Sequence, residues 1–474
     1  MRIDRNKLAL LSILASLIAV TAITPSAFAA VEPNENGSIG FVGPKDNPYE
    51  CWTPEGDPCP IDTGDTAWML TASALVLFMT PGVAFFYGGL ARQKNAVSTI
   101  MMTFIVIGII SVQWVLWGYS LAFGPPTDGA HDFVGDFSYL ALNGVSHEAP
   151  LGNYEEGEWS SIPHQLFMIF QAMFAIITPA LIVGGLIDRM KFSALVIFIP
   201  IWASFVYDPV AHWVWGGGWL MDLGALDFAG GTVVHITSGW AALAGALILG
   251  RRLGYGKVPM EAHNIPLVVL GASMLWFGWF GFNAGSGLAA SGLDTSAFVV
   301  TNTATAMASV TWMLMSWAHT GRPSLAGAAS GAVAGLVAIT PASGFVGVMG
   351  SIIIGIAAGT ICYGCVVFKN RRKWDDALDV WGVHGMGGTT GAVLTGVLAN
   401  EHIGGVPGGW EGNIEQIGIN SVGAAASIAY AFGITLLILK IMDAVWPGGI
   451  RVTPKEEEIG LDLAQHGEKA YVLT

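Results

Sequence analysis

The chain has 474 residues, of which 53% are apolar and only 11% are charged, and its mean hydropathy is positive. A composition so poor in charge excludes a set of soluble domains and indicates an all-α protein that crosses a membrane many times. The formal net charge is -14, and no nucleic-acid partner is expected. The 63 glycines fit helices that pack closely through small faces, as in the spacing Gly327-x-x-x-Gly331-x-x-x-Gly335.

The N-terminus has the pattern of a secretory signal peptide. Basic residues precede an apolar run from 8 to 23, and the small-x-small sequence Ala27-Phe28-Ala29 follows it. We therefore predict that residues 1–30 are cleaved and that residues 31–64 form an extracellular segment. Retention of the run as an extra span is the alternative, because the run is short but near the lower limit for crossing a bilayer.

The four cysteines fall into two pairs in different surroundings. Cys51 and Cys59 lie in the exported, proline-rich segment, where oxidising conditions would let them form a disulfide across a short loop. Cys362 and Cys365 fall inside an apolar helix, where cysteines usually behave as small hydrophobic residues. We therefore predict no redox or metal role for this second pair.

Eleven apolar segments follow, each suited to a membrane helix. They predict a transmembrane domain over 65–446, and the break at Pro447-Gly448-Gly449 releases a charged, soluble tail over 447–474. The segments are 66–91, 96–123, 162–187, 193–213, 230–250, 265–284, 296–318, 324–340, 345–368, 379–399 and 418–446.

Lysine and arginine assign the two faces, because they accumulate in cytoplasmic connections of membrane proteins. Almost all of them follow the odd-numbered segments, and Lys45 alone is left on the opposite face. The chain is therefore predicted to be a multi-pass protein of the cell membrane with its N-terminus outside and its C-terminus inside. The residues that decide this orientation are Arg92, Lys94, Arg189, Lys191, Arg251, Arg252, Lys257, Arg322, Lys369, Arg371, Arg372, Lys373, Lys440, Arg451, Lys455 and Lys469.

Two apolar segments each carry a histidine. His235 and His384 both follow a valine, and each has a glycine four residues later, Gly239 and Gly388, on the same helix face. An ionisable residue inside a span usually faces the bundle interior or a water-lined cavity. Matching histidines in two halves predict an inverted internal repeat, spans 1–5 and 6–10, with the site between the halves. A structural hydrogen bond between helices and a metal or haem site are the alternatives.

Two longer motifs carry a family resemblance. One is Asp227-Phe-Ala-Gly-Gly followed by His235, and the other is Trp276-Phe-Gly-Trp-Phe-Gly-Phe-Asn-Ala-Gly-Ser286. Together they closely resemble the ammonium transporters of the Amt/Mep/Rh superfamily, on the prokaryotic Amt branch. The resemblance runs from about Ala67 to the last residues of the chain.

The resemblance implies roles for residues along a pore. It implies an outer recruitment site made of an aromatic ring and a hydroxyl, a gate of two stacked phenylalanines, and two facing histidines below the gate. In this order, the matching residues are Trp215 and Ser286, Phe174 and Phe282, and His235 and His384.

The residues alone leave some of these assignments open. A tryptophan at the end of a span is more often an interfacial anchor, and the resemblance rather than physics selects Trp215 over Trp213. A single phenylalanine is more often a core residue. Asp227 is the natural N-cap of its helix, and the matching acid of the family supports the outer site without touching the substrate, so we expect a structural role.

The expected function is ammonium transport, with no enzymatic activity. Ammonium would lose a proton at the outer site and cross as ammonia, because dehydrating a cation in an apolar pore is costly and potassium has no proton to lose. The resemblance also implies a homotrimer and a tail that docks on neighbouring loops and contacts PII-type signal proteins. No cofactor or metal is expected. A sensor that binds ammonium without much flux is a further alternative.

Overall fold

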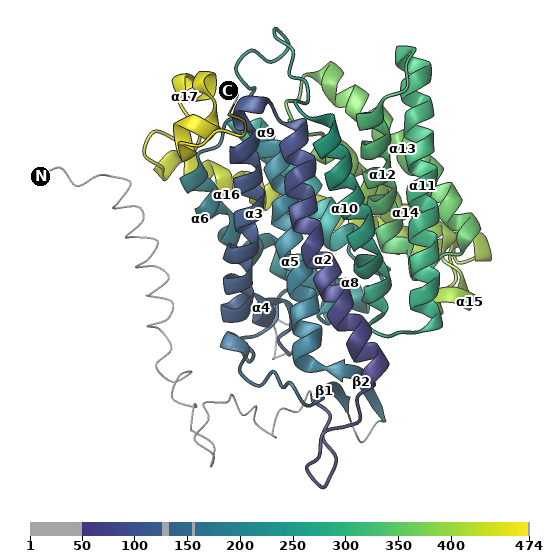
Figure 1. Cartoon of the computed structure of the whole chain (residues 1–474). Coiled ribbons are helices and arrows are strands. Elements are labelled where there is room, and N and C mark those ends of the chain that lie inside the picture. Colours follow the sequence, from purple (N-terminus) through teal and green to yellow (C-terminus); the bar gives the residue numbers. More distant parts are fainter. Residues whose placement is uncertain (1–49, 126–131, 154–156, 473–474) are drawn as a thin grey trace, which may run out of the picture.

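The computed structural model describes residues 50–125, 132–153 and 157–472. Long helices run side by side through the molecule, a short β-hairpin lies at one end, and the C-terminal segment folds against the opposite end (Figure 1). We call these two ends the hairpin end and the tail end. The predicted signal peptide and residues 31–49 of the predicted extracellular segment lie outside the described residues.

Helices form nearly all of the regular structure. The helical elements are α2 (Thr63–Leu90), η1 (Gln93–Asn95), α3 (Ala96–Gln113), η2 (Trp114–Gly118), α4 (Tyr119–Phe123), η3 (Leu140–Leu142), α5 (His164–Leu186), α6 (Phe192–Trp202), η4 (Ala203–Tyr207), α7 (Asp208–Trp215), α8 (Trp219–Asp222), η5 (Gly231–Ile236), α9 (Thr237–Leu249), α10 (Ile265–Ala284), η6 (Gly285–Gly287), α11 (Gly292–Thr320), α12 (Leu325–Ile339), η7 (Thr340–Ala342), α13 (Val348–Arg372), η8 (Trp381–Gly385), α14 (Met386–Leu398), α15 (Glu401–Gly404), η9 (Gly409–Glu411), α16 (Ile414–Val445), α17 (Pro454–Ile459) and η10 (Asp462–His466).

Ten helices of the described chain have the length and apolar composition of membrane spans. They match ten of the eleven predicted segments. The exception is the predicted segment 379–399, where η8 and α14 form a glycine-rich helix that packs against α9, α12, α13 and α16 as its neighbours do. The segment is rich in glycine, which lowers its hydropathy, because small residues let it pack closely among its neighbouring helices.

Burial separates central spans from peripheral ones. In α5 and in the η5–α9 span, 83% of the most apolar window is buried, whereas in α11 and α13 the share is 33%. The predicted glycine face of α12 packs on α11, since a β-carbon on Gly331 or Gly335 would lie only 2.9 or 2.8 Å from the carbonyl oxygen of Ala308 or Ala304. The centre of the bundle is therefore formed by α5 and α9, and the site lies there.

π-helical turns occur in four of the spans, at η2, η4, η5 and η8. Such turns insert a residue into the helical hydrogen-bond ladder and are frequent at functional sites, because they change the direction of a side chain. His235 lies in η5 and His384 lies in η8. Sequence periodicity predicts regular helices here, so these local distortions are a feature that only the structure shows.

A buried ion-pair network closes the tail end. Asp375 pairs with Arg189 at 3.0 Å and with Arg252 at 2.8 Å, and Arg252 also reaches Asp188 at 3.3 Å. Burial alone would raise the pKa of Asp375, but the hydrogen bonds of Arg252 and the charge of Arg189 hold that pKa below its usual value. Burial lowers the pKa of Arg189 to about 10, which leaves the guanidinium charged at neutral pH.

The composition of the C-terminal tail predicts only a soluble segment, but the structure shows that the tail is folded. Its short helices α17 and η10 lie against the tail end of the bundle (Figure 1). Lys94 donates to the carbonyl oxygen of Glu457 at 2.7 Å, and the Ser98 backbone N–H donates to Asp462 at 2.8 Å, at the start of α3. Docking of the tail on neighbouring loops agrees with what the family resemblance implies.

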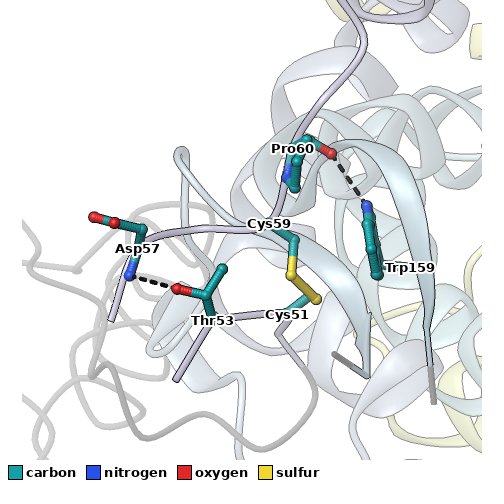
Figure 2. Close-up of a disulfide and its surroundings, with 6 residues drawn as sticks. All are labelled: Cys51, Thr53, Asp57, Cys59, Pro60 and Trp159. Carbon is teal, nitrogen blue, oxygen red and sulfur yellow. Dashed lines mark hydrogen bonds between the residues drawn. A yellow bond between two sulfur atoms is a disulfide. The ribbon is translucent and has the colours of Figure 1, made fainter. Parts of the chain in front are cut away.

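The hairpin end contains a two-stranded antiparallel sheet that the all-α prediction misses. Its strands are β1 (Pro150–Asn153) and β2 (Glu158–Pro163), and β2 leads directly into α5. Cys51 and Cys59 are joined by a disulfide beside this hairpin (Figure 2). The sheet was missed because two strands of four and six residues between long apolar spans leave almost no periodic signal.

Candidate functional site

The two histidines face each other in the interior of the bundle. Nδ1 of His235 lies 3.2 Å from Nδ1 of His384, and the ring centroids are 5.3 Å apart with an interplanar angle of 28°. Both residues are buried, with 1% and 4% of their surface exposed. The sequence prediction that they meet is therefore confirmed.

Glycine makes the close approach of the two histidine helices possible. A β-carbon on Gly388 would lie 2.7 Å from the carbonyl oxygen of Gly231 and 3.0 Å from Cβ of His235. No ordinary side chain fits in that space. The glycine four residues after each histidine thus has a packing function in both halves, because a β-carbon on Gly239 would collide in the same way with the backbone of Gly385.

The geometry of the pair constrains its protons. A hydrogen bond between the two Nδ1 atoms needs one of them to donate and the other to accept. The accepting Nδ1 carries no hydrogen, so at least one of the two rings has no positive charge. Nε2 of His235 is buried and has no hydrogen-bond partner among the described residues. A small molecule that both donates and accepts hydrogen bonds would satisfy this nitrogen.

Aromatic rings continue from the histidines toward the hairpin end. His235 stacks on Trp279 at 5.2 Å and on Phe282 at 6.0 Å between centroids. Phe282 in turn lies 4.3 Å from Phe174, and both phenylalanines are buried. The two phenylalanines that the resemblance implies therefore lie in contact next to His235, with their ring planes tilted by 40° rather than stacked.

Trp215 extends this aromatic column. Its ring lies edge-on to Phe174 at 5.9 Å, and its Nε1 donates a hydrogen bond of 2.9 Å to the carbonyl oxygen of Asp227. Trp213 points elsewhere, since it packs against Trp219 and Tyr430 and donates to the carbonyl oxygen of Phe133. The structure thus gives a physical reason, absent from the sequence, for preferring Trp215 over Trp213.

Asp227 organises the start of the helix that carries His235. Its carboxylate accepts hydrogen bonds from four consecutive backbone N–H groups, those of Gly230, Gly231, Thr232 and Val233, at 2.7 to 3.1 Å. The N-cap residue itself is Gly230, whose φ of 108° is left-handed. Asp227 therefore caps the helix from three residues upstream, not from the N-cap position predicted from the sequence, because glycine is needed where the chain turns.

Ser286 lies in η6, at the end of α10 that follows Phe282. Its hydroxyl donates a hydrogen bond of 2.8 Å to the carbonyl oxygen of Phe282, and the residue is partly exposed. The oxygen lone pairs of this hydroxyl stay available to a donor. Ser286 therefore lies next to Phe282, one of the two phenylalanines that the resemblance implies for the gate.

Sequence reasoning missed two aromatic contributors, Phe170 and Trp279. Phe170 lies 4.9 Å from Phe174, one helical turn away on α5. Trp279 stacks on the His235 ring. Its Nε1 donates hydrogen bonds to Oγ1 of Thr340 at 2.9 Å and to Oδ1 of Asn283 at 3.2 Å. The only signal for Trp279 was its place inside the Trp276-to-Ser286 motif, and Phe170 had only its spacing of four residues from Phe174.

Metal binding finds no support in the side chains near the pair. Within the described ranges, no group of three or more His, Cys, Asp or Glu side chains lies close enough together to hold a metal ion. The histidine pair has apolar and aromatic neighbours in place of a third ligand.

Comparison with known proteins gives the family. The sequence model of the Ammonium Transporter Family matches residues 67–471. The chain belongs to the ammonium transporter family. It is 50% identical over 416 residues to an ammonium transporter of Aquifex aeolicus, covering 87% of this chain and 94% of that protein. It is 46% identical over 408 residues to ammonium transporter Amt1 of Archaeoglobus fulgidus, covering 86% and 99%.

Solved structures agree with this membership. The crystal structure of Saccharomyces cerevisiae Mep2 superimposes with a TM-score of 0.79 at 38% identity, covering 87% of this chain and 92% of that one. The protein is thus a multi-pass membrane protein and an ammonium transporter of the Amt/Mep type, not an enzyme. The facing histidines lie within the part of the chain that matches the family.

Proposed function

We propose that this transporter recruits ammonium beside Trp215 and Ser286, where the ion releases its proton to the water at the hairpin end, and conducts ammonia past Phe174 and Phe282 to the histidine pair. The observation that carries the proposal is the continuous contact from the Trp215 ring through the two phenylalanines to His235 and His384. Each step of the path has a group suited to it.

The physical argument rests on the cost of dehydration. A cation that leaves water for a passage lined by aromatic carbon loses most of its solvation free energy, whereas neutral ammonia loses little. Because the two Nδ1 atoms share one hydrogen, one neutral ring presents an accepting Nε2 and the other presents a donating Nε2–H, so the pair together can accept from an ammonia N–H group and donate to the ammonia lone pair. The histidine pair therefore suits ammonia, and it offers potassium no comparable compensation.

Trp215→Leu is expected to weaken the apparent affinity for ammonium about five- to thirtyfold. The substitution removes a cation–π contact worth about 1–2 kcal/mol at a partly desolvated site. The concentration dependence of uptake into proteoliposomes measures this effect. Trp410→Leu is the matched control, because Trp410 is 71% exposed and lies outside the aromatic column. Equal affinities for both variants and the unchanged protein would mean that Trp215 is only an interfacial anchor.

For the membrane arrangement we propose eleven spans, with η8 and α14 as the tenth, in an inverted repeat. The spacing of eight residues between Asp227 and His235 recurs between Asp376 and His384, and Asp376 also accepts a backbone N–H at a helix start, that of Trp381 at 2.8 Å. The hairpin end would then face outward and the tail end would face the cytoplasm.

Labelling of single cysteines tests this orientation. Lys257→Cys and Arg371→Cys are exposed positions at the tail end, and in a background without the four native cysteines they should resist an impermeant thiol reagent added outside. Arg189 and Arg252 are poorer choices, because both are buried in ion pairs. Trp410→Cys is the control that should react. Labelling of position 257 from outside in intact cells would refute the assignment.

Further parts of the proposal concern maturation and assembly. Residues 1–30 are removed as a signal peptide, residues 31–64 lie outside the cell, and the transmembrane domain spans 65–446. Three subunits form a homotrimer with one pore each, and a PII-type protein meets the tail end. N-terminal sequencing and native mass spectrometry of the purified protein test the cleavage site and the number of subunits.

A further inference from the structure

A buried acid lies at the hairpin end, far from the histidine pair in the chain. The Glu50 and His164 side chains are each 0% exposed, and Oε1 of Glu50 lies 2.8 Å from Nδ1 of His164. On the other side of the imidazole ring, Nε2 lies 2.6 Å from the hydroxyl of Tyr119. Because a carboxylate accepts, Nδ1 carries hydrogen, and a neutral ring then accepts the Tyr119 hydroxyl hydrogen at Nε2.

Glu50 also holds the loop that caps α5. The first turn of α5 has no capping side chain, since Pro163 precedes His164. Its N–H groups are satisfied by the loop instead, through His164 N to Ala149 O at 3.0 Å and Gln165 N to Ser146 O at 2.9 Å. The Ser146 N–H donates in turn to Oε1 of Glu50 at 2.7 Å. One carboxylate oxygen therefore fixes both the first side chain of α5 and the loop that caps it.

Residues 50–62, which we call the strap, attach this acid to the hairpin. The Cys51–Cys59 disulfide closes the strap, and Trp159 Nε1 on β2 donates to Pro60 O at 3.2 Å (Figure 2). Backbone bonds join Cys51 N to Pro150 O at 2.9 Å and Asp62 N to Ser161 O at 2.8 Å. The match to the family begins at residue 67, so the strap precedes the matched part.

α5 connects this anchor to the aromatic column. Phe170 and Phe174 follow His164 by six and ten residues, which places them about 9 and 15 Å further along the same rigid helix. A β-carbon on Gly285 would lie 2.9 Å from the Phe170 ring, and Gly285 directly precedes Ser286. A shift of α5 along its axis would therefore change the contact of Phe174 with Phe282 and the surroundings of Ser286 together.

We propose that Glu50 is a positioning residue for the outer gate. Through His164 and Ser146 it sets the axial position of α5, and thereby the separation of Phe174 from Phe282. The proposal rests on the proposed function of these two rings as a gate. Glu50 itself touches neither ring and no substrate.

The test compares Glu50→Gln with Glu55→Gln, the same change at an exposed position of the strap. Ammonium uptake by purified protein in proteoliposomes is followed as internal pH and normalised to folded protein. Glu50→Gln should lower the maximal rate at least about fivefold, since a buried hydrogen-bonded charge is lost, whereas Glu55→Gln should leave it unchanged. Tyr119→Phe removes the hydrogen bond to Nε2 of His164 and should also lower the maximal rate. This variant tests the proposal if Glu50→Gln does not fold.

A second readout separates positioning from a merely structural role. In cryo-electron microscopy of both proteins, the Glu50→Gln or Tyr119→Phe variant should show the first turns of α5 displaced and a Phe174–Phe282 centroid separation different from that of the unaltered protein, which is 4.3 Å in this structure. An unchanged separation, or equal rates for Glu50→Gln and Glu55→Gln, overturns the proposal. If the unaltered protein takes up no ammonium at all, the proposed pore fails instead, and the two failures are thus distinguishable.

Discussion

His235→Ala is expected to lower ammonium uptake about tenfold to a hundredfold while the protein still assembles. The substitution removes the hydrogen-bond partner of Nδ1 of His384, which lies 3.2 Å away, and leaves that buried nitrogen unsatisfied. An unmade buried hydrogen bond costs about 1–3 kcal/mol, and an addition of about 1.4–2.7 kcal/mol to the barrier, within that range, slows passage about tenfold to a hundredfold. Uptake into proteoliposomes at saturating ammonium, with gel filtration of the same preparation, measures both parts of the expectation.

The control for this variant is His402→Ala, at an exposed histidine of α15. It should leave both uptake and assembly as they are. A histidine that serves only to link two helices would give another pattern, in which His235→Ala loses folded protein but retains the rate per folded molecule. Uptake by His235→Ala at the original rate would rule out a role of the pair in conduction.

Asp227→Ala is expected to destabilise the protein by more than about 3 kcal/mol, because four buried N–H groups lose a charged acceptor at once. The midpoint of thermal unfolding in detergent should fall, and little folded protein should reach the membrane. The unfolding midpoint of Asp227→Asn should lie between those of the unaltered protein and Asp227→Ala. An amide retains one acceptor oxygen but presents its NH2 group to the remaining backbone donors.

The same substitution tests the link from Asp227 to the outer site. The Trp215 indole donates to the main-chain carbonyl oxygen of Asp227, which stays in Asp227→Asn but moves when the carboxylate bonds that fix this segment weaken. An Asp227→Asn protein that folds should therefore also bind ammonium more weakly. Asp222→Ala, at an exposed acid of α8, is the control and should change neither quantity. An Asp227→Ala protein with unchanged unfolding midpoint would show that the backbone N–H groups find other acceptors.

The spans and the histidine pair could be predicted from the sequence for clear physical reasons. A bilayer demands long apolar helices, so their lengths and the basic connections between them are visible in one dimension. His235 and His384 stood out because ionisable groups are rare in such helices and because their local sequences match. The segment 379–399 is not among the ten helices of the described chain that have the composition of membrane spans, yet its apolar run predicts a span and His384 marks it as part of the site.

Contacts between distant segments could not be predicted in the same way. Nothing near Glu50 in the sequence indicates that it meets His164, because the pair forms only when the hairpin folds onto the bundle. The π-helical turns under His235 and His384 depend on how neighbouring helices pack, and no periodicity predicts them. The choice of Trp215 over Trp213 likewise depends on which ring points toward Phe174.

The most direct test of the twin-histidine pore is the permeability of His235→Glu to potassium. A carboxylate fixed in the passage would stabilise a bare cation where a neutral imidazole does not. In planar bilayers or proteoliposomes, the unaltered protein should carry no potassium current in the absence of ammonium, and His235→Glu should carry one that depends on potassium concentration. If His235→Glu folds, takes up ammonium at the original rate and still excludes potassium, the histidine pair does not determine what passes through this transporter.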